Sequence, residues 1–247
     1  MANPITWFEI NGPEPDQTSK FYSEVFGWHM DTVPGNYIII DTHAGQGMNG
    51  GIGETREGQP PHSVFYVENP DIQKLLDQAG RLGAKTIVPV TEVPDMVTFA
   101  QFSDPFGNLI GLVQGPGEVV KISEGSNPPV DWVEVACAQP ERAWDFYRKL
   151  FGWKIEGGPA QEGQGFVHGS IDTGGPGARG GIGSSPDGQP HVTVYALVDD
   201  LQKYLERAES LGGKVAMEPM QVDEHTHIAM FVDPQGTAFG MYRYEEL

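Results

Sequence analysis

Residues 21–28 read FYSEVFGW, and 125 positions later residues 146–153 read FYRKLFGW. In each segment the aromatic residues have helical spacing, and a glycine followed by tryptophan ends the run. A glycine at such a position is the usual stop of a helix. The recurrence of so specific a segment predicts that the chain contains two copies of one structural unit.

Further blocks recur in the same order on both sides of these segments. Trp7-Phe8-Glu9-Ile10 recurs as Trp132-Val133-Glu134-Val135, and Gly50-Gly51-Ile52-Gly53 recurs as Gly180-Gly181-Ile182-Gly183. Asp71-Ile72-Gln73-Lys74 recurs as Asp200-Leu201-Gln202-Lys203, and Asp104-Pro105 with Gly107 recurs as Asp233-Pro234 with Gly236. The chain is therefore a tandem duplication of a domain of roughly 115 residues, a common domain size.

Each copy predicts an α+β domain in which a βαβββ pattern occurs twice. In the first copy, residues 5–10 are rich in β-branched and aromatic residues, and a helix follows from Asp16 as N-cap to Gly27. Short glycine-bounded strands are expected around 28–33, 36–42 and 48–53. The second half predicts a strand at 62–67, a helix at 71–83, and strands at 85–90, 97–103 and 109–114. We expect two four-stranded layers per copy with the helices outside.

The domain boundaries follow from turn-forming residues between the copies. Residues 114–129 contain Gly-Pro and Pro-Pro pairs and no apolar period, which is typical of a linker. The sequence predicts domain 1 at residues 1–117, a linker at 118–129 and domain 2 at 130–247.

Composition and charge exclude several classes of partner. Lys and Arg number 15 and Asp and Glu 34, which gives a formal charge of −19. Such a surface repels phosphate backbones and anionic lipids, so we expect no nucleic acid and no membrane partner. No apolar run is long enough to span a bilayer and no signal peptide pattern begins the chain, so we expect a cytoplasmic protein. Cys137, the one cysteine, is expected to be a buried strand residue.

The ordered blocks resemble the vicinal oxygen chelate superfamily, which includes glyoxalase I, extradiol dioxygenases and bleomycin-resistance proteins. The resemblance is carried by FYSEVFGW, by Asp104-Pro105-Phe106-Gly107-Asn108, and by their counterparts in the second copy. It implies two tandem glyoxalase-like domains, each built of paired βαβββ modules that form an open curved barrel around a pocket. In catalytic members, the pocket holds a divalent metal.

The positions from which catalytic members draw metal ligands hold other residues in this chain. They are Trp7, Val64 and Gly111 in the first copy, and Trp132, Thr193 and Gly240 in the second copy. The fourth-strand position falls in a Gly-Gly-Ile-Gly segment in both copies. These side chains are poor metal ligands, so we predict no metal site and no cofactor. His225 and His227 lie two apart and could share one strand face, but the first copy has Met96 and Thr98 at the corresponding positions, so we do not assign them to a metal site.

The predicted pocket is built from alternating strand residues, because residues two apart share a sheet face. Glu9 and Glu134 are the candidate catalytic or charge-pairing residues, since carboxylates are seldom buried unless paired or used. The candidate ligand-binding residues are Trp7, His62, Tyr66, Trp132, His191, Thr193 and Tyr195. A structural interpretation stays open, in which the aromatic rings fill the barrel, the glutamates accept structural hydrogen bonds, and both His62 and His191 lie at the rim.

These residues favour a small-molecule binding protein of the glyoxalase and bleomycin-resistance type. We expect it to be metal-independent and to act in sequestration or detoxification, with a small-molecule ligand that is partly apolar or cationic. The alternative is a glyoxalase-like lyase or isomerase in which a pocket Glu is the general base. A hydroxylase or dioxygenase is a third possibility and requires an iron triad. The oligomeric state stays open, and a monomer is consistent with two covalently joined domains.

Overall fold

The computed structural model describes residues 2–115, 122–158 and 167–245. The elements of the first copy are β1 (Ile5–Gly12), α1 (Pro15–Phe26), β2 (His29–Val33), β3 (Tyr37–Asp41), β4 (Asn49–Glu54), β5 (His62–Asn69), α2 (Ile72–Arg81), β6 (Lys85–Val93), β7 (Val97–Ser103) and β8 (Leu109–Gln114). The predicted α+β class and the repeated βαβββ order are confirmed.

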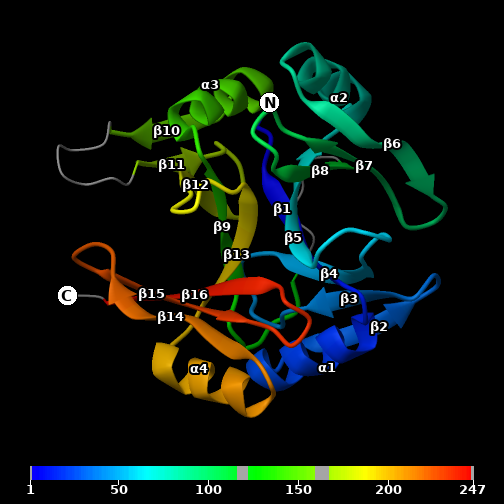
Figure 1. The fold of residues 1–247 in the computed structure, drawn as a ribbon. Coiled ribbons are helices and arrows are strands. Elements are labelled where there is room, and N and C mark those ends of the chain that lie inside the picture. The colour runs from blue at the N-terminus through cyan, green and yellow to red at the C-terminus, as the bar shows by residue number, and fades with distance from the viewer. Residues whose placement is uncertain (1, 116–121, 159–166, 246–247) are drawn as a thin grey trace. The chain divides into compact units, whose positions relative to one another are not determined.

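The second copy repeats the order with one element for each element of the first (Figure 1). Its elements are β9 (Val130–Cys137), α3 (Pro140–Phe151), β10 (Lys154–Gly157), β11 (His168–Asp172), β12 (Arg179–Ser184), β13 (His191–Leu197), α4 (Leu201–Ser210), β14 (Lys214–Gln221), β15 (Thr226–Val232) and β16 (Ala238–Tyr244). Within the described ranges, none of the helices is long and apolar enough to cross a membrane.

The first helix begins earlier than its sequence indicates. Its N-cap is Glu14, and Pro15 occupies the first helical turn, so the prediction of Asp16 as N-cap was wrong. Proline suits this position because its fixed φ is helical and its missing N–H would have no helical acceptor. The predicted stop at Gly27 is confirmed, since this residue has φ 76° in the left-handed region.

The strands of each copy form one mixed sheet with a repeated order. The order is β2-β3-β4-β1-β5-β8-β7-β6 in the first copy and β10-β11-β12-β9-β13-β16-β15-β14 in the second. The expectation of two separate four-stranded layers was therefore wrong: the two βαβββ modules of a copy share one open sheet. Neither sheet closes on itself, in agreement with the expected open curved barrel.

Two compact units divide the chain, and each takes segments from both copies. Unit 1 comprises Met1–Thr6, Val64–Val119 and Trp132–Val192, and unit 2 comprises Trp7–Ser63, Val120–Asp131 and Thr193–Leu247. The predicted sequence boundaries at residues 117 and 130 stay a prediction, because a division by spatial compactness does not test them.

In unit 2, α1 packs beside α4, the blue and orange helices of Figure 1. The aromatic side chains between them form a continuous core of Phe21, Tyr22, Phe26, Trp28, Tyr204, Phe231 and Phe239. The Tyr22 hydroxyl donates to Asp233 Oδ2 at 3.3 Å, in the turn before β16. The predicted FYSEVFGW helix of the first copy is thus completed by residues from the second copy.

In unit 1, α2 packs beside α3, the teal and green helices of Figure 1. Its aromatic core contains Phe65, Phe102, Phe106, Phe146, Tyr147, Phe151 and Trp153. The Tyr147 hydroxyl donates to Asp104 Oδ2 at 2.8 Å. Cys137 ends β9 fully buried, as predicted, and burial raises the pKa of its thiol.

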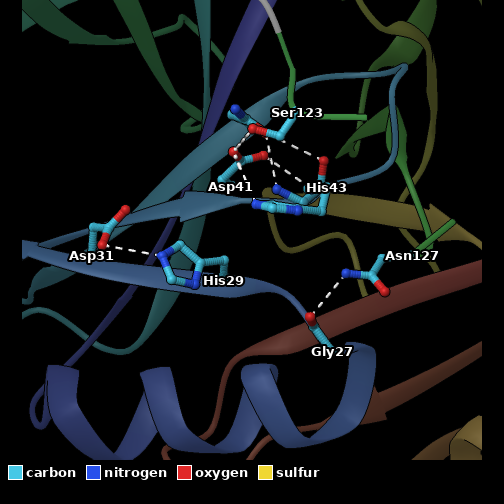
Figure 2. Close-up of polar contacts among 9 residues, drawn as sticks. Gly27, His29, Asp31, Asp41, His43, Ser123 and Asn127 are labelled. Carbon is cyan, nitrogen blue, oxygen red and sulfur yellow. Dashed lines mark hydrogen bonds and ion pairs between the residues drawn. The ribbon is translucent and has the colours of Figure 1, made fainter. Parts of the chain in front are cut away.

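The described part of the predicted linker is held against unit 2 (Figure 2). Residues 116–121 lie outside the described residues. Beyond them, Ser123 donates to the Asp41 carboxylate, and the Asn127 amide donates to Gly27 O at 2.8 Å. Trp28 Nε1 also donates to Pro128 O at 2.9 Å. The carboxylate of Asp41 and the C-terminal end of α1 therefore fix residues 123–128 in place.

Candidate functional site

The first strand of each copy presents Trp and Glu on the same face. In β1, Phe8 and Ile10 are fully buried, whereas Trp7 and Glu9 are only partly buried. In β9, Val133 and Val135 are fully buried, and Trp132 and Glu134 are partly buried. The predicted alternation is confirmed in both copies, and it places a carboxylate beside an indole on the face turned away from the helices.

In unit 2, a tyrosine that the sequence did not single out completes this arrangement. Tyr37, the first residue of β3, donates its hydroxyl to Glu9 Oε1 at 2.9 Å. Trp7 Nε1 donates to the Tyr37 hydroxyl oxygen at 3.1 Å. The indole therefore orients the phenol, and the phenol hydrogen-bonds the carboxylate. Hydrogen bonds to ionised groups are stronger than neutral ones, so the hydrogen bonds from Trp7 to Tyr37 and from Tyr37 to Glu9 favour a charged Glu9.

A glycine provides the space for this tyrosine. Gly51 lies opposite Glu9 in the parallel pairing of β1 with β4. A Cβ atom built on Gly51 would overlap the hydroxyl of Tyr37. The Gly-Gly-Ile-Gly segment of β4 therefore leaves the space in which the phenol of Tyr37 reaches the carboxylate of Glu9.

Unit 1 contains the same arrangement with histidine in place of tyrosine. His168, the first residue of β11, has Nε2 3.2 Å from Oε2 and 3.1 Å from Oε1 of Glu134. Trp132 Nε1 donates to Glu134 Oε2 at 3.2 Å. The hydrogen-bond geometry favours Oε2; within the described ranges, Oε1 is buried and accepts no hydrogen bond. A Cβ on Gly181 would overlap both His168 and Glu134, so this glycine corresponds to Gly51.

The two sites differ in how they respond to protons. Burial and then the charge of Glu9 raise the pKa of Tyr37 well above 10, so its phenol stays protonated at physiological pH. Burial alone would lower the pKa of His168, but the hydrogen bond and charge of Glu134 outweigh burial and raise the pKa above 6.5. The side chains of His168 and Glu134 are 33% and 19% exposed, so a solvent proton can reach the pair.

The predicted tyrosines Tyr66 and Tyr195 lie over glycines of the neighbouring strand. In unit 1, Tyr66 pairs in register with Gly111, and its hydroxyl accepts from Gln101 Nε2 at 2.7 Å. In unit 2, Tyr195 pairs with Gly240, and its hydroxyl lies 3.7 Å from Met230 Sδ. A Cβ at either glycine would overlap the tyrosine ring. At the predicted ligand positions Gly111 and Gly240, an aromatic ring from the adjacent strand thus takes up the space.

The residues present do not fit the family metal. The ligand positions hold Trp7, Val64 and Gly111 or their counterparts, and the glycine positions are covered by Tyr66 and Tyr195. Among the residues that the structure describes, no three His, Cys, Asp or Glu side chains converge on one point.

The remaining predicted residues lie outside the Trp and Glu networks. His62 and His191 hold their Nδ1 atoms 2.9 Å from Pro60 O and 3.2 Å from Gln189 O, in the turns that precede their strands. Thr193 is almost fully buried in β13. His225 packs its ring against Tyr244, and His227 lies on the adjoining strand β15.

A surface hollow elsewhere in unit 2 is a weaker candidate. It has a volume of about 350 Å³ and is lined by Ser126, Asn127, Pro128, Pro129, Leu197, Val198, Asp199 and Tyr204. Its carboxylate, Asp199, is 72% exposed and lies beside Lys203. An exposed and paired carboxylate gives a ligand little charge to bind, so we place the site at the partly buried glutamates.

Models of known families match both halves of the chain. The model of the Glyoxalase/Bleomycin resistance protein/Dioxygenase superfamily matches residues 5–112. The Glyoxalase-like domain model matches residues 132–241. The chain belongs to this superfamily. Its two matched regions are the two copies identified from the repeat, so the tandem glyoxalase-like architecture is confirmed.

Similar proteins match over most of their length. CFP32 of Mycobacterium tuberculosis (strain CDC 1551 / Oshkosh), named provisionally as a glyoxylase, is 25% identical, and the match covers 96% of this chain and 93% of CFP32. The anthracycline biosynthesis protein DauV of Streptomyces sp. (strain C5) is 26% identical over 97% of this chain and 93% of DauV. The Mn(II)-bound glyoxalase from Novosphingobium aromaticivorans superposes with a TM-score of 0.72 at 15% identity, covering 100% of this chain and 84% of that one, and this likeness shows the fold alone.

Proposed function

We propose that this superfamily member binds a small, partly apolar organic cation without a metal, and acts in sequestration or detoxification. The observation that supports it is the partly buried carboxylate held beside an indole in each copy, Glu9 with Trp7 and Glu134 with Trp132. Pockets for small molecules combine apolar walls with a few polar groups of this kind.

The physical argument rests on the cost of burying a charge. A carboxylate withdrawn from water is unfavourable unless hydrogen bonds or an opposite charge compensate for the loss of hydration. Tyr37 donates one hydrogen bond to Glu9, and both Trp132 and His168 contact the carboxylate of Glu134. A cationic ligand would add an opposite charge beside each carboxylate, and the adjacent indole would add a cation–π contact worth about 0.5–2 kcal/mol.

The alternative function is a lyase or isomerase in which Glu134 removes a proton next to a carbonyl. One contact favours it: the imidazole of His168 lies within 3.2 Å of the carboxylate and can share the abstracted proton. An enzyme of this kind exchanges that proton with solvent, so deuterium from D₂O should enter the carbon next to the carbonyl of dihydroxyacetone. An oxygenase needs two histidines and one carboxylate on iron, and such a set is not among the described side chains.

The binding proposal is tested with benzyltrimethylammonium, whose charge does not titrate, and with benzyl alcohol as a neutral comparator. Glu9→Gln and Glu134→Gln keep the shape of the side chain and remove its charge. Each variant should weaken binding at one site about ten- to a hundredfold, equal to about 1.5–3 kcal/mol for a charge-assisted contact. Glu57→Gln, on an exposed loop, is the matched control and should bind as the wild type does.

The melting temperature separates binding from a structural role. A functional carboxylate adds little stability, so both glutamine variants should melt close to the wild-type temperature. A lower melting temperature with unchanged affinity for benzyltrimethylammonium would show that the glutamates are structural. Equal affinity for benzyl alcohol and the ammonium would show that charge does not drive binding.

A further inference from the structure

We propose that His29 and His43 form a binding site for a late first-row divalent cation such as Zn²⁺ at the edge of the sheet in unit 2. Imidazole is the side chain that most often binds such ions in proteins. The site is separate from the proposed function, whose ligand binds without a metal. It also differs from the family metal site, whose ligand positions lie on β1, β5 and β8.

The two imidazole rings lie beside each other (Figure 2). His29 is the first residue of β2, and His43 follows the end of β3 by two residues. The ring centroids are 5.7 Å apart. A zinc ion lies about 2.0–2.1 Å from each imidazole nitrogen that binds it, so two rings on one ion have centroids roughly 5–6 Å apart. The two rings therefore have the separation that a shared ion requires.

Each imidazole has a carboxylate at the same ring nitrogen. Nε2 of His29 is 3.2 Å from Asp31 Oδ1, and Nε2 of His43 is 3.5 Å from Asp41 Oδ2. Histidines that bind metals commonly donate one ring N–H to a carboxylate, which fixes the tautomer and makes the other nitrogen more basic. We therefore expect Nδ1 of each ring to be the atom that binds the ion.

The rest of the coordination sphere comes from solvent. Among the residues that the structure describes, no three His, Cys, Asp or Glu side chains are placed to hold one ion together. Zinc is usually four-coordinate, so water completes a site with two protein ligands. The side chains of His29 and His43 are 59% and 43% exposed, which gives water access and lets the rings rotate toward the ion. The net charge of −19 also attracts cations to the protein surface.

The second copy has the same strand pairing without the imidazoles. Lys154 occupies the position of His29, because Lys154 pairs with Asp172 as His29 pairs with Asp41. The backbone of this hairpin therefore forms without an ion, and a metal at the first copy is bound by a fold that does not need it. The inference applies to the first copy alone.

His43 occupies a backbone conformation that favours glycine. Its φ is 49°, in the left-handed region, and its N–H donates to Asp41 Oδ1 at 3.0 Å. In the second copy, Gly174 has φ 70° and donates to Asp172 Oδ1 at 2.9 Å. Glycine adopts this conformation at almost no steric cost, whereas a side chain with a Cβ is less favourable there. An imidazole where glycine fits better supports a role for the ring.

Two strands separate this edge of the sheet from the carboxylate of Glu9. Asp31 on β2 pairs with Ile39 on β3. Ile39 pairs with Gly51 on β4, and Gly51 pairs with Glu9 on β1. Three strand spacings of about 4.8 Å give roughly 14 Å between the backbones of Asp31 and Glu9. An ion at the edge therefore leaves the Glu9 network unchanged, and the two sites can be tested separately.

Calorimetric titration of the chelator-treated chain with Zn²⁺ tests the site at about pH 8, where unperturbed imidazoles are neutral. His29→Gln and His43→Gly should each weaken zinc binding at least about tenfold, a loss typical even of a group that only supports a metal ligand. His43→Gly places at this position the residue that the second copy has. The control His225→Asn, in the bend before β15, should bind zinc as the wild type does.

NMR on the wild type identifies the atoms that bind the ion. In long-range proton–nitrogen spectra, Zn²⁺ should shift the Nδ1 resonances of both His29 and His43 and leave those of His225 unchanged. Mg²⁺ prefers oxygen ligands and should shift neither ring. A zinc shift in only one of the two rings, or an equal response to Mg²⁺, would overturn the shared imidazole site.

The binding outcomes are independent of the proposed function. Zinc affinity that is unchanged in both His29→Gln and His43→Gly, or that is lost in His225→Asn, overturns the inference. Binding of benzyltrimethylammonium should be the same in His29→Gln as in the wild type, because the edge of the sheet is separate from Glu9. Circular dichroism checks that the variants fold. If either variant does not, the zinc-induced shifts in the wild-type spectra still decide the case.

Discussion

Replacing Tyr147 with phenylalanine removes one hydroxyl from the core of unit 1. This hydroxyl donates to Asp104 Oδ2 at 2.8 Å, and both residues are buried. After its loss, Oδ2 keeps the Asn108 Nδ2 donor at 3.1 Å. A hydrogen bond to a charged group contributes about 1.5–3 kcal/mol. For a chain of this size, the melting temperature should fall by about 3–12 °C.

The loss should depend on pH in a defined direction. Burial raises the pKa of Asp104, and the donors Tyr147 and Asn108 offset part of that rise. A raised folded-state pKa gives stability at low pH that is lost as the pH rises through this pKa. Tyr147→Phe should raise the pKa of Asp104 further, so the substitution should lower the free energy of unfolding more at pH 8 than at pH 5. Urea unfolding at both values measures the difference.

The matched control is Tyr22→Phe in unit 2. The Tyr22 hydroxyl makes the corresponding contact to Asp233 at 3.3 Å, which is long for a strong hydrogen bond. Its loss should therefore cost less than the loss of the Tyr147 hydroxyl. An equal or larger cost for Tyr22→Phe, or a Tyr147→Phe penalty that is the same at pH 5 and pH 8, would refute the reasoning from distance and charge.

Two further predictions concern the sites. Gly51→Ala should push Tyr37 away from Glu9 and weaken the binding of benzyltrimethylammonium at the first site, as measured by equilibrium binding. The control Gly80→Ala, in open space on α2, should leave this binding unchanged. In thermal melts, Gly80→Ala should raise the stability by up to about 1 kcal/mol. If the protein is metal-independent, as proposed, dialysis against a chelator should shift the melting temperature by no more than about one degree; a large drop restored by a divalent ion would contradict this.

Local sequence patterns predicted the elements but not all the partners at the sites. The alternation of Trp7, Phe8, Glu9 and Ile10 followed from the two-residue period of a strand. The end of the helix at Gly27 followed from the ease with which glycine adopts the left-handed conformation. Tyr37 and His168 were missed because the strands that carry them are short and bounded by turns. The available signal was the glycine opposite each glutamate, which leaves a space that some large side chain must fill.

Local sequence patterns could not predict which segments of the chain make up each unit, and the reason is different. Tyr22 pairs with Asp233 and Tyr147 pairs with Asp104, across more than 40 positions of the chain in each case. The repeat gives both tyrosines and both aspartates similar surroundings in sequence. Nothing local distinguishes a partner in the same copy from one in the other copy, and the choice is made by tertiary packing.

The covalent joining of the two copies has a consequence for how such sites can evolve. In an assembly of two identical chains, every substitution is imposed on both sites at once, so a residue that suits one and harms the other is lost. In this chain, position 37 and position 168 are encoded separately, and they hold a phenol and an imidazole against otherwise matching carboxylates. Because the two copies are joined in one chain, equivalent positions can change separately, and one gene can encode two different partners for the two carboxylates.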